Sequence, residues 1–196
     1  MVLNKNIRER RKEELDEKFT WLNAFVIIFA VYLLLFFFRT FVYAPVQVVG
    51  KSMMPTLESG DMLVADKTAA IKRGDVIVFS DENKDKSYIK RVIGIPGDEI
   101  MIKGGNVYRS ENGGDFVLLE EDYVSSPTTI AGNFEKAVYS VPEGRLFVMG
   151  DNRINSSDSR YSTIGLPKIS SVLGVVPEWV VDSKDSIFTK LLTCIL

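Results

Sequence analysis

The longest apolar stretch of the chain places the strongest constraint on its fold. The eighteen residues from Trp21 to Phe38 carry no charge, and Lys18 and Arg39 stand on either side of them. A helix of this length can cross the hydrocarbon core of a bilayer. A buried helix of a soluble domain would normally show a polar stripe, whereas only Asn23 and Tyr32 interrupt the apolar residues here. The sequence therefore predicts one transmembrane helix over residues 21–38.

The apolar core of a cleaved signal peptide is the main alternative for this stretch. The run is longer than a typical h-region, and no A-x-A-like cleavage site follows it, because the chain continues as Arg39-Thr-Phe-Val-Tyr. We therefore expect an uncleaved anchor that holds the protein in the lipid bilayer.

Basic residues are distributed unevenly around this anchor. The first twenty residues after it contain only Arg39 and Lys51. The segment ahead of it contains six, which are Lys5, Arg8, Arg10, Arg11, Lys12 and Lys18. By the positive-inside rule, residues 1–20 stay in the cytoplasm and the chain after the anchor is exported. We expect a single-pass protein of the cell membrane with an extracytoplasmic domain.

Composition removes several kinds of chemistry. The 196 residues include no histidine, which excludes Ser-His-Asp triads, Cys-His pairs and HExxH metal sites. The single cysteine, Cys194, allows neither a disulfide within the chain nor a cysteine-based zinc site. The net charge of -2 gives no basic surface of the kind that nucleic acids need, so we expect no nucleic-acid partner.

Beyond the anchor the pattern becomes that of a β protein. Short runs rich in Val, Ile, Phe and Tyr alternate with turn pairs such as Gly60-Asp61 and Gly74-Asp75. This spacing predicts a mainly β fold, with an antiparallel domain over residues 39–182. Residues 103–140 are rich in Gly, Ser, Thr, Asn and acidic residues, and we expect either an inserted smaller β subdomain or a long surface excursion. The tail, 183–196, is too short for a second membrane span.

A serine nucleophile in a chain without histidine needs another general base. Lysine can serve if burial in apolar surroundings lowers its pKa until the neutral amine is populated. Ser52 follows a predicted strand in a turn that contains Gly50 and Pro55, and Lys90 lies within another predicted strand. Each is ordinary by itself, because serines are common in turns and lysines on strands are usually solvated. A catalytic role for Ser52 and Lys90 therefore needs support from a wider sequence pattern.

Four short segments of the chain form such a pattern. Their sequences and their order resemble those of the bacterial type I signal peptidases, and with the anchor the resemblance covers most of residues 21–174. The four segments are GKSMMPTL from Gly50, RGDVIVF from Arg73, YIKRVIGIPGD from Tyr88, and VMGDNR from Val148 followed by SSDSR from Ser156.

The resemblance implies roles for the residues that match these motifs. Ser52 corresponds to the nucleophile, Lys90 to the general base, and Ser156 to the hydroxyl that hydrogen-bonds and orients the lysine amine. Many relatives have a serine two positions before the nucleophile as an oxyanion donor, where this chain has Gly50. We therefore expect backbone N–H groups to form the oxyanion hole, that of Ser52 first. The chemistry implies no metal and no organic cofactor.

Further positions resemble residues that surround the family's site. Three are supporting charges, for which we expect a salt-bridged turn without a direct chemical part. These are Asp151, Asp158 and Arg160. Another three resemble residues that line substrate pockets, although each also fits a plain β core. These are Val48, Leu57 and Ile89.

The implied function is that of a membrane-bound serine endopeptidase that removes signal peptides from exported preproteins. A self-cleaving Ser-Lys protease of the repressor type would lack the anchor and carry a DNA-binding segment, and neither condition is met. The alternative is a catalytically silent relative that acts as a membrane assembly factor or chaperone. The joint presence of Ser52, Lys90 and Ser156 argues against it. The expected partners are signal peptides and the lipid bilayer, and the sequence gives no indication of oligomeric state.

Overall fold

The computed structural model describes residues 2–81, 86–130 and 136–183. The chain divides into two compact units, Met1–Phe41 and Val42–Leu196. The mainly antiparallel β fold with one N-terminal apolar helix agrees with the fold class predicted from the sequence.

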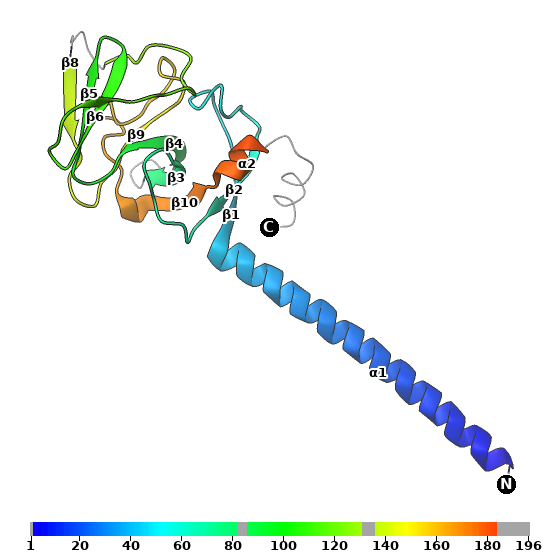
Figure 1. Ribbon diagram of the computed structural model, residues 1–196. Helices are drawn as coiled ribbons and strands as arrows, with labels where there is room; N and C mark the ends of the chain where they lie inside the picture. Colours follow the sequence, from blue (N-terminus) through cyan, green and yellow to red (C-terminus); the bar gives the residue numbers. More distant parts are fainter. Residues whose placement is uncertain (1, 82–85, 131–135, 184–196) are drawn as a thin grey trace. The chain divides into compact units, whose positions relative to one another are not determined.

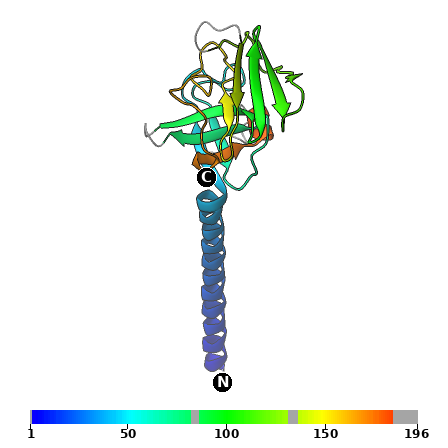
Figure 2. The ribbon, with the colours of Figure 1, turned by 90° about the vertical axis from the view of Figure 1, so that its left-hand side faces the viewer.

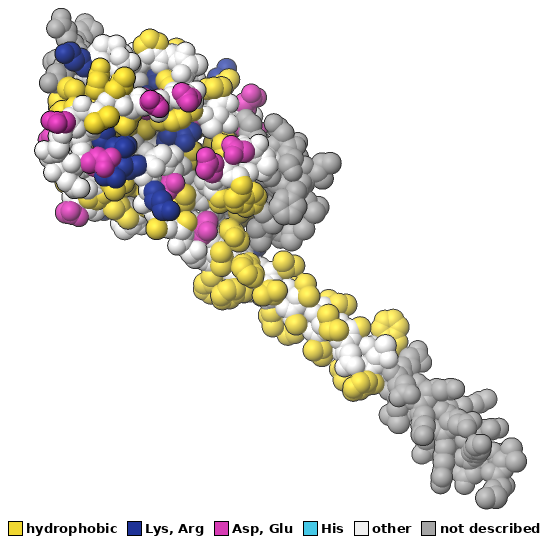
Figure 3. Space-filling view, viewed as in Figure 1, with side chains coloured by type: hydrophobic (Ala, Val, Ile, Leu, Met, Phe, Trp, Pro, Cys, Tyr) yellow, Lys and Arg dark blue, Asp and Glu magenta, His cyan; other side chains and the backbone are white. Residues whose placement is uncertain are grey.

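The first unit is a single long helix, α1 (Val2–Phe37), which a π-helical turn, Phe38–Val42, extends. Its stretch Lys18–Val42 has a mean hydropathy of 2.5, and none of its residues is buried inside the protein. Figure 3 shows apolar side chains along the described part of this helix. A helix that is apolar on all sides and buries none of them has the surface expected in lipid. The predicted span 21–38 lies within it, and the predicted cytoplasmic segment continues the same helix.

The second unit is built around a six-stranded antiparallel sheet in the order β1-β2-β10-β3-β4-β9 (Figure 1). Its third strand along the chain, β3, reads Val-Ile-Val-Phe and is buried on both faces, since alternate residues point to opposite sides of a sheet. The strands are β1 (Tyr43–Gln47), β2 (Met62–Asp66), β3 (Val76–Asp81), β4 (Lys86–Gly94), β9 (Phe147–Met149) and β10 (Val172–Val176).

A smaller four-stranded antiparallel sheet follows β4, in the order β7-β6-β5-β8. Figure 1 labels three of its strands, β5, β6 and β8, and Figure 2 shows the same sheet turned by 90°. It begins at Asp98, ahead of the predicted start at residue 103, because β5 pairs with both β6 and β8 over its whole length or nearly so. The strands are β5 (Asp98–Lys103), β6 (Asn106–Glu111), β7 (Val117–Leu118) and β8 (Lys136–Ser140). A short helix, α2 (Glu178–Asp182), follows β10.

Three apolar clusters hold these elements together. One packs Val76 and Val78 of β3 against the turn that follows β1, including Met53 and Leu57. Another packs the neighbouring side chains of β3 against β9 and β10. The third joins the two sheets through Ile100 of β5 and side chains of β4 and β9. The turn after β1 is thereby fixed on the six-stranded sheet.

Candidate active site

The side chains of Ser52 and Lys90 meet although 38 residues separate them in the chain. Ser52 lies in the turn after β1, and Lys90 lies in the middle of β4. The Lys90 ammonium donates hydrogen bonds to Ser52 Oγ at 2.7 Å and to the carbonyl oxygen of Ile89 at 2.9 Å. The pair is thus within the distance over which a proton can pass directly between two side chains.

The surroundings of Lys90 favour its neutral form. The residue is 3% exposed. Burial lowers the pKa of Lys90 to about 8, while the charges of Asp158 and Asp151 act in the opposite direction. A group with this pKa is neutral in roughly a tenth of molecules at pH 7, against fewer than about one in a thousand for a solvated lysine. Lys90 can therefore accept a proton near neutral pH.

The turn that carries Ser52 is held by a segment that follows β9. The backbone N–H of Asn152 donates to the carbonyl oxygen of Ser52 at 3.0 Å, and its side-chain Nδ2 donates to the carbonyl oxygen of Lys51 at 3.0 Å. Gly150 packs against the same turn so closely that a Cβ there would collide with Ser52 O and Ser156 Oγ. Only glycine permits this approach.

The predicted supporting charges form two separate ion pairs at this segment. Buried Asp151 accepts from Arg91 Nε at 2.9 Å and Nη2 at 2.7 Å, and also from Thr56 Oγ1 at 2.5 Å. Buried Asp158 accepts from Arg160 Nε and Nη2, both at 2.8 Å, and from the backbone N–H of Gly150 at 3.0 Å. Each carboxylate therefore has its own guanidinium, as expected of a salt-bridged turn.

Ser156 is buried in the same segment, but its contacts differ from the expectation. Within the described parts of the chain, Ser156 Oγ has no hydrogen-bond partner, and the expected bond to the amine is absent from the contacts of Lys90. The amine instead uses Ser52 Oγ and the carbonyl of its own neighbour Ile89. The Ser156 hydroxyl lies beside Gly150 and keeps its bonding capacity unused.

A cleft of about 150 Å³ opens at Ser52 and Lys90. Val48 and Ile89, two of the predicted substrate-pocket residues, line it together with Met53 and Tyr88. Leu57 does not belong to the lining; it is fully buried in the cluster beneath the turn. The core interpretation therefore applies to Leu57, because the turn directs this side chain toward the sheet.

Gly50 lies at the rim of the cleft with a φ of 96°, a conformation that glycine adopts readily. Its N–H donates to Ser59 Oγ at 3.3 Å. The backbone N–H of Ser52, by contrast, has no acceptor among the residues that the structure describes. This N–H is therefore available for the oxyanion role expected from the sequence.

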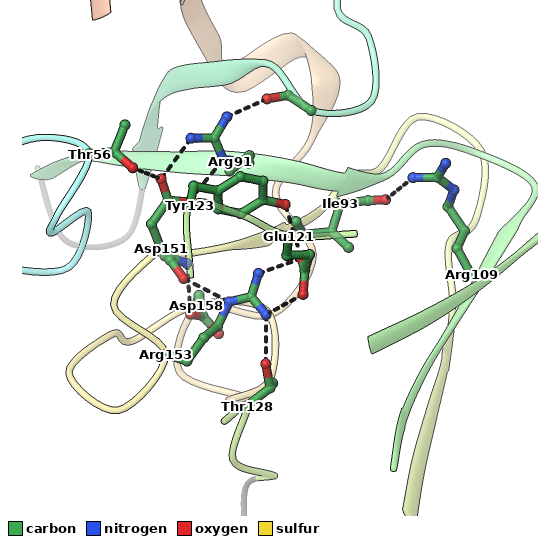
Figure 4. Close-up of polar contacts among 12 residues, drawn as sticks. Thr56, Arg91, Ile93, Arg109, Glu121, Tyr123, Thr128, Asp151, Arg153 and Asp158 are labelled. Carbon is green, nitrogen blue, oxygen red and sulfur yellow. Dashed lines mark hydrogen bonds and ion pairs between the residues drawn. The ribbon is translucent and has the colours of Figure 1, made fainter. Parts of the chain in front are cut away.

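Several residues of the site were not assigned from the sequence. Arg91 binds Asp151 and stacks on the ring of Tyr123 at 4.0 Å, and Arg153 binds Glu121 (Figure 4). Arg91 and Arg153 stand inside matched motifs, whereas Tyr123 and Glu121 lie in the segment before β8, where no motif marked them. Across residues 2–81, 86–130 and 136–183, no group of three or more Cys, Asp or Glu is placed to hold a metal ion.

Comparisons with known proteins show which family the chain belongs to. The model of the family "Signal peptidase, peptidase S26" matches residues 19–180. Signal peptidase I U of Bacillus subtilis (strain 168) is 38% identical over 148 residues, which are 72% of this chain and 77% of that protein. Signal peptidase I P of Bacillus subtilis subsp. natto is 37% identical over 175 residues, which are 86% of this chain and 90% of that protein.

Among solved structures, a signal peptidase I from Enterococcus faecalis V583 matches with a TM-score of 0.45 and 34% identity. The match covers 56% of this chain and 98% of that chain. The family model extends over more than half of the sequence, and the curated relatives match over most of theirs. This chain belongs to the peptidase S26 family of signal peptidases.

Proposed function

We propose that Ser52 and Lys90 form the catalytic dyad with which this signal peptidase, a serine endopeptidase, removes signal peptides. The observation that carries the proposal is the 2.7 Å contact between Lys90 Nζ and Ser52 Oγ in a buried setting that lowers the pKa of Lys90 to about 8. Nucleophile and base within direct reach are what covalent catalysis requires. The silent alternative finds no support in this geometry.

The reaction follows from the positions of the two groups. Neutral Lys90 accepts the proton of Ser52 Oγ as the oxygen attacks the scissile carbonyl, and the resulting ammonium gives that proton to the leaving amine. A water molecule, deprotonated by the same amine, then hydrolyses the acyl-enzyme and restores the Ser52 hydroxyl. The N–H of Ser52 is our candidate for the oxyanion donor.

Ser156 is proposed to assist Lys90 when the amine changes partner. Once Ser52 is acylated, its Oγ is part of an ester and is a weaker acceptor for the Lys90 amine. The buried hydroxyl of Ser156, in the segment after β9, has no hydrogen-bond partner among the described residues and can accept from the amine instead. The proposed role is to orient the amine for attack by water. It requires a side-chain movement from the geometry described above.

The substrate is proposed to bind as an extended strand in the cleft. On one side, β1 pairs only with β2 among the described strands. On the other, β4 pairs with β9 only from Arg91 onward, which leaves the part before Lys90 open along one edge. Residues just after β1 and residues 87–90 of β4 both line the cleft. Main-chain pairing with such edges holds a peptide, and a cleft of about 150 Å³ favours small side chains.

The membrane-anchored character of the protein agrees with the apolar helix and with its relatives. We propose in addition that the helix crosses the lipid bilayer once, with the N-terminus in the cytoplasm and Val42–Leu196 outside. The support is the excess of basic residues ahead of the span. An extracytoplasmic domain would meet signal peptides where exported proteins emerge.

Substitution of the dyad tests the assignment directly. In purified full-length protein, Ser52→Ala and Lys90→Ala should each lower cleavage of a precursor by at least about 10³-fold. The double variant should lose no more, because the two groups act as a unit. Matched controls are Lys72→Ala and Ser162→Ala, which change exposed side chains of the same types and should leave the rate unchanged. Turnover near the wild-type rate in either dyad variant would refute the proposal.

A further inference from the structure

One short segment before β8 makes contacts with three arginines of the matched motifs. Arg91 stands next to Lys90, whereas Arg153 and Arg160 belong to the segment after β9. The guanidinium of Arg91 lies 4.0 Å from the ring centre of Tyr123, and Arg160 Nη1 donates to the carbonyl oxygen of Thr129 at 3.0 Å. Residues 121–129 therefore contact the site from a part of the chain that lies outside the matched motifs.

The strongest of these contacts is the ion pair between Arg153 and Glu121. The Arg153 side chain is fully buried, and its two terminal nitrogens donate to Glu121 at 2.9 Å and 2.6 Å. Thr128 Oγ1 accepts a further bond from Arg153 at 2.6 Å, and Tyr123 donates its hydroxyl hydrogen to Glu121 Oε1 at 3.0 Å. Figure 4 shows Arg153 between Glu121 and Thr128. A buried guanidinium without these acceptors would carry an uncompensated charge.

Arg153 is connected to the nucleophile, Ser52, through the turn from Gly150 to Asn152. Its Nε donates to the carbonyl oxygen of Gly150 at 3.0 Å, which fixes the start of the turn from Gly150 to Asn152. The end of that turn, Asn152, donates its N–H to the carbonyl oxygen of Ser52 at 3.0 Å. The position of Ser52 is thus connected through hydrogen bonds to Arg153, and through Arg153 to Glu121.

We propose that Glu121 is a positioning residue for the cleavage reaction, which acts through Arg153 and the Gly150–Asn152 turn to hold Ser52 against Lys90. The inference rests on the proposed Ser52–Lys90 dyad. Glu121 does not touch the reacting atoms. Its effect is on the geometry of the nucleophile, where a displacement of about 1 Å can cost about 10²-fold in rate.

The main experiment compares Glu121→Gln with Glu120→Gln in the full-length protein. Glu120 is the exposed neighbour, so its substitution removes the same charge without touching Arg153. Glu121→Gln should lower kcat for a signal-peptide substrate by about 10- to 100-fold, with KM within about twofold. Glu120→Gln should match the wild type. Rates are taken well below the melting temperature of each variant, with the folded fraction measured by circular dichroism.

A double-mutant cycle shows whether Glu121 acts through Arg153. Glu121→Gln combined with Arg153→Met should be no slower than Arg153→Met alone, because the proposal assigns the effect of the carboxylate on Ser52 to its bonds with Arg153. Additive losses in the double variant would overturn the proposal. So would a folded Glu121→Gln protein with the kcat of the wild type, or a loss of kcat that only follows the loss of folded protein.

A milder pair covers the case in which Glu121→Gln fails to fold. Thr128→Val removes one acceptor of Arg153 at nearly constant volume, and Thr128→Ser keeps the hydroxyl. Thr128→Val should lower kcat and Thr128→Ser should restore it, whereas equal kcat values in Thr128→Val and wild type would overturn the proposal. Cleavage by Ser52→Ala would instead refute the dyad. An inactive Ser52→Ala with a fully active Glu121→Gln would refute only the positioning role.

Discussion

Burial of the Lys90 side chain gives its amine a chemistry that a solvated lysine lacks. Removal from water disfavours the ammonium form, and the carboxylates of Asp158 and Asp151 only partly offset this effect. Each carboxylate is itself paired with an arginine. At the scale of the residue, burial therefore gives Lys90 the neutral form that its proposed role as a base requires, without any histidine.

The pH dependence of cleavage should report this group. We expect the single-turnover rate to rise with pH through one ionisation near pH 8 and then to level off, because protonated Lys90 cannot accept the Ser52 proton. Ser156→Ala should lower the plateau of the multiple-turnover rate, which includes attack by water on the acyl-enzyme, and Ser156→Thr should preserve it because threonine keeps a hydroxyl. Quenched-flow rates across this pH range measure both effects. A midpoint near 10.5, the value for a solvated lysine, would contradict the assignment.

Alanine substitutions at two glycines should affect different properties, the catalytic rate at one position and the stability of the fold at the other. Gly150→Ala should lower kcat by about 10²-fold or more, because the new Cβ collides with the backbone oxygen of Ser52, which cannot move without displacing the nucleophile. Gly94→Ala meets side-chain atoms of Ile100 at 3.0 Å and of Val141 at 3.2 Å. These can shift, so this control should lower the melting temperature and keep kcat. Equal activity of the two variants would contradict the idea that close packing of Gly150 holds Ser52 in position.

At the scale of elements, the site is an arrangement of two turns around one strand. The turn after β1 carries Ser52, β4 carries Lys90, and the turn after β9 bonds to the first turn through Asn152. The pairing of β4 with β9 from Arg91 to Gly94 places this second turn beside Lys90. The same pairing stops before Lys90, which leaves an edge of β4 available at the cleft.

The cleft and the core beneath it can be separated by substitution. Ile89→Ala should enlarge the cleft and relax the preference for small residues at the cleavage site, because Ile89 lines it. Leu57→Ala should leave that preference unchanged and lower the free energy of unfolding by about 2 to 5 kcal/mol, since Leu57 is fully buried in the core. Cleavage of a peptide library and denaturant unfolding measure the two properties. A changed cleavage preference in Leu57→Ala would show that Leu57 does contact the substrate, as the resemblance implies.

At the scale of the whole molecule, the two units have surfaces suited to different solvents. Lys18–Val42 exposes apolar side chains on every side, whereas Val42–Leu196 closes three apolar clusters within itself. A chain of this kind needs lipid for one unit and water for the other. This division is the physical basis for the proposed single-pass topology.

Protease protection tests that topology in cells. Protease added outside spheroplasts should digest Val42–Leu196, while an epitope tag at the N-terminus should remain intact until the membrane is permeabilised with detergent. Permeabilised cells provide the control for access of the protease to the tag. Protection of the β domain together with digestion of the tag would reverse the proposed orientation.

Local patterns of the sequence determine much of this protein. The apolar run Trp21–Phe38 predicts a membrane helix because its composition alone decides which solvent it can enter. Alternating apolar runs between turn pairs predict antiparallel strands, and the absence of histidine makes lysine the expected base. The matched motifs then single out Ser52 and Lys90.

Only the tertiary structure decided which side chains meet, because a sequence pattern does not carry distances between segments far apart in the chain. The pairing of Arg153 with Glu121 was hidden, since one partner lies outside every motif. From the sequence, Leu57 and Ile89 were equally good candidates for the substrate pocket. In the structure, Leu57 is fully buried in the core and Ile89 lines the cleft. The lowered pKa of Lys90 likewise arises from burial by residues distant in sequence, which only the packed fold brings together.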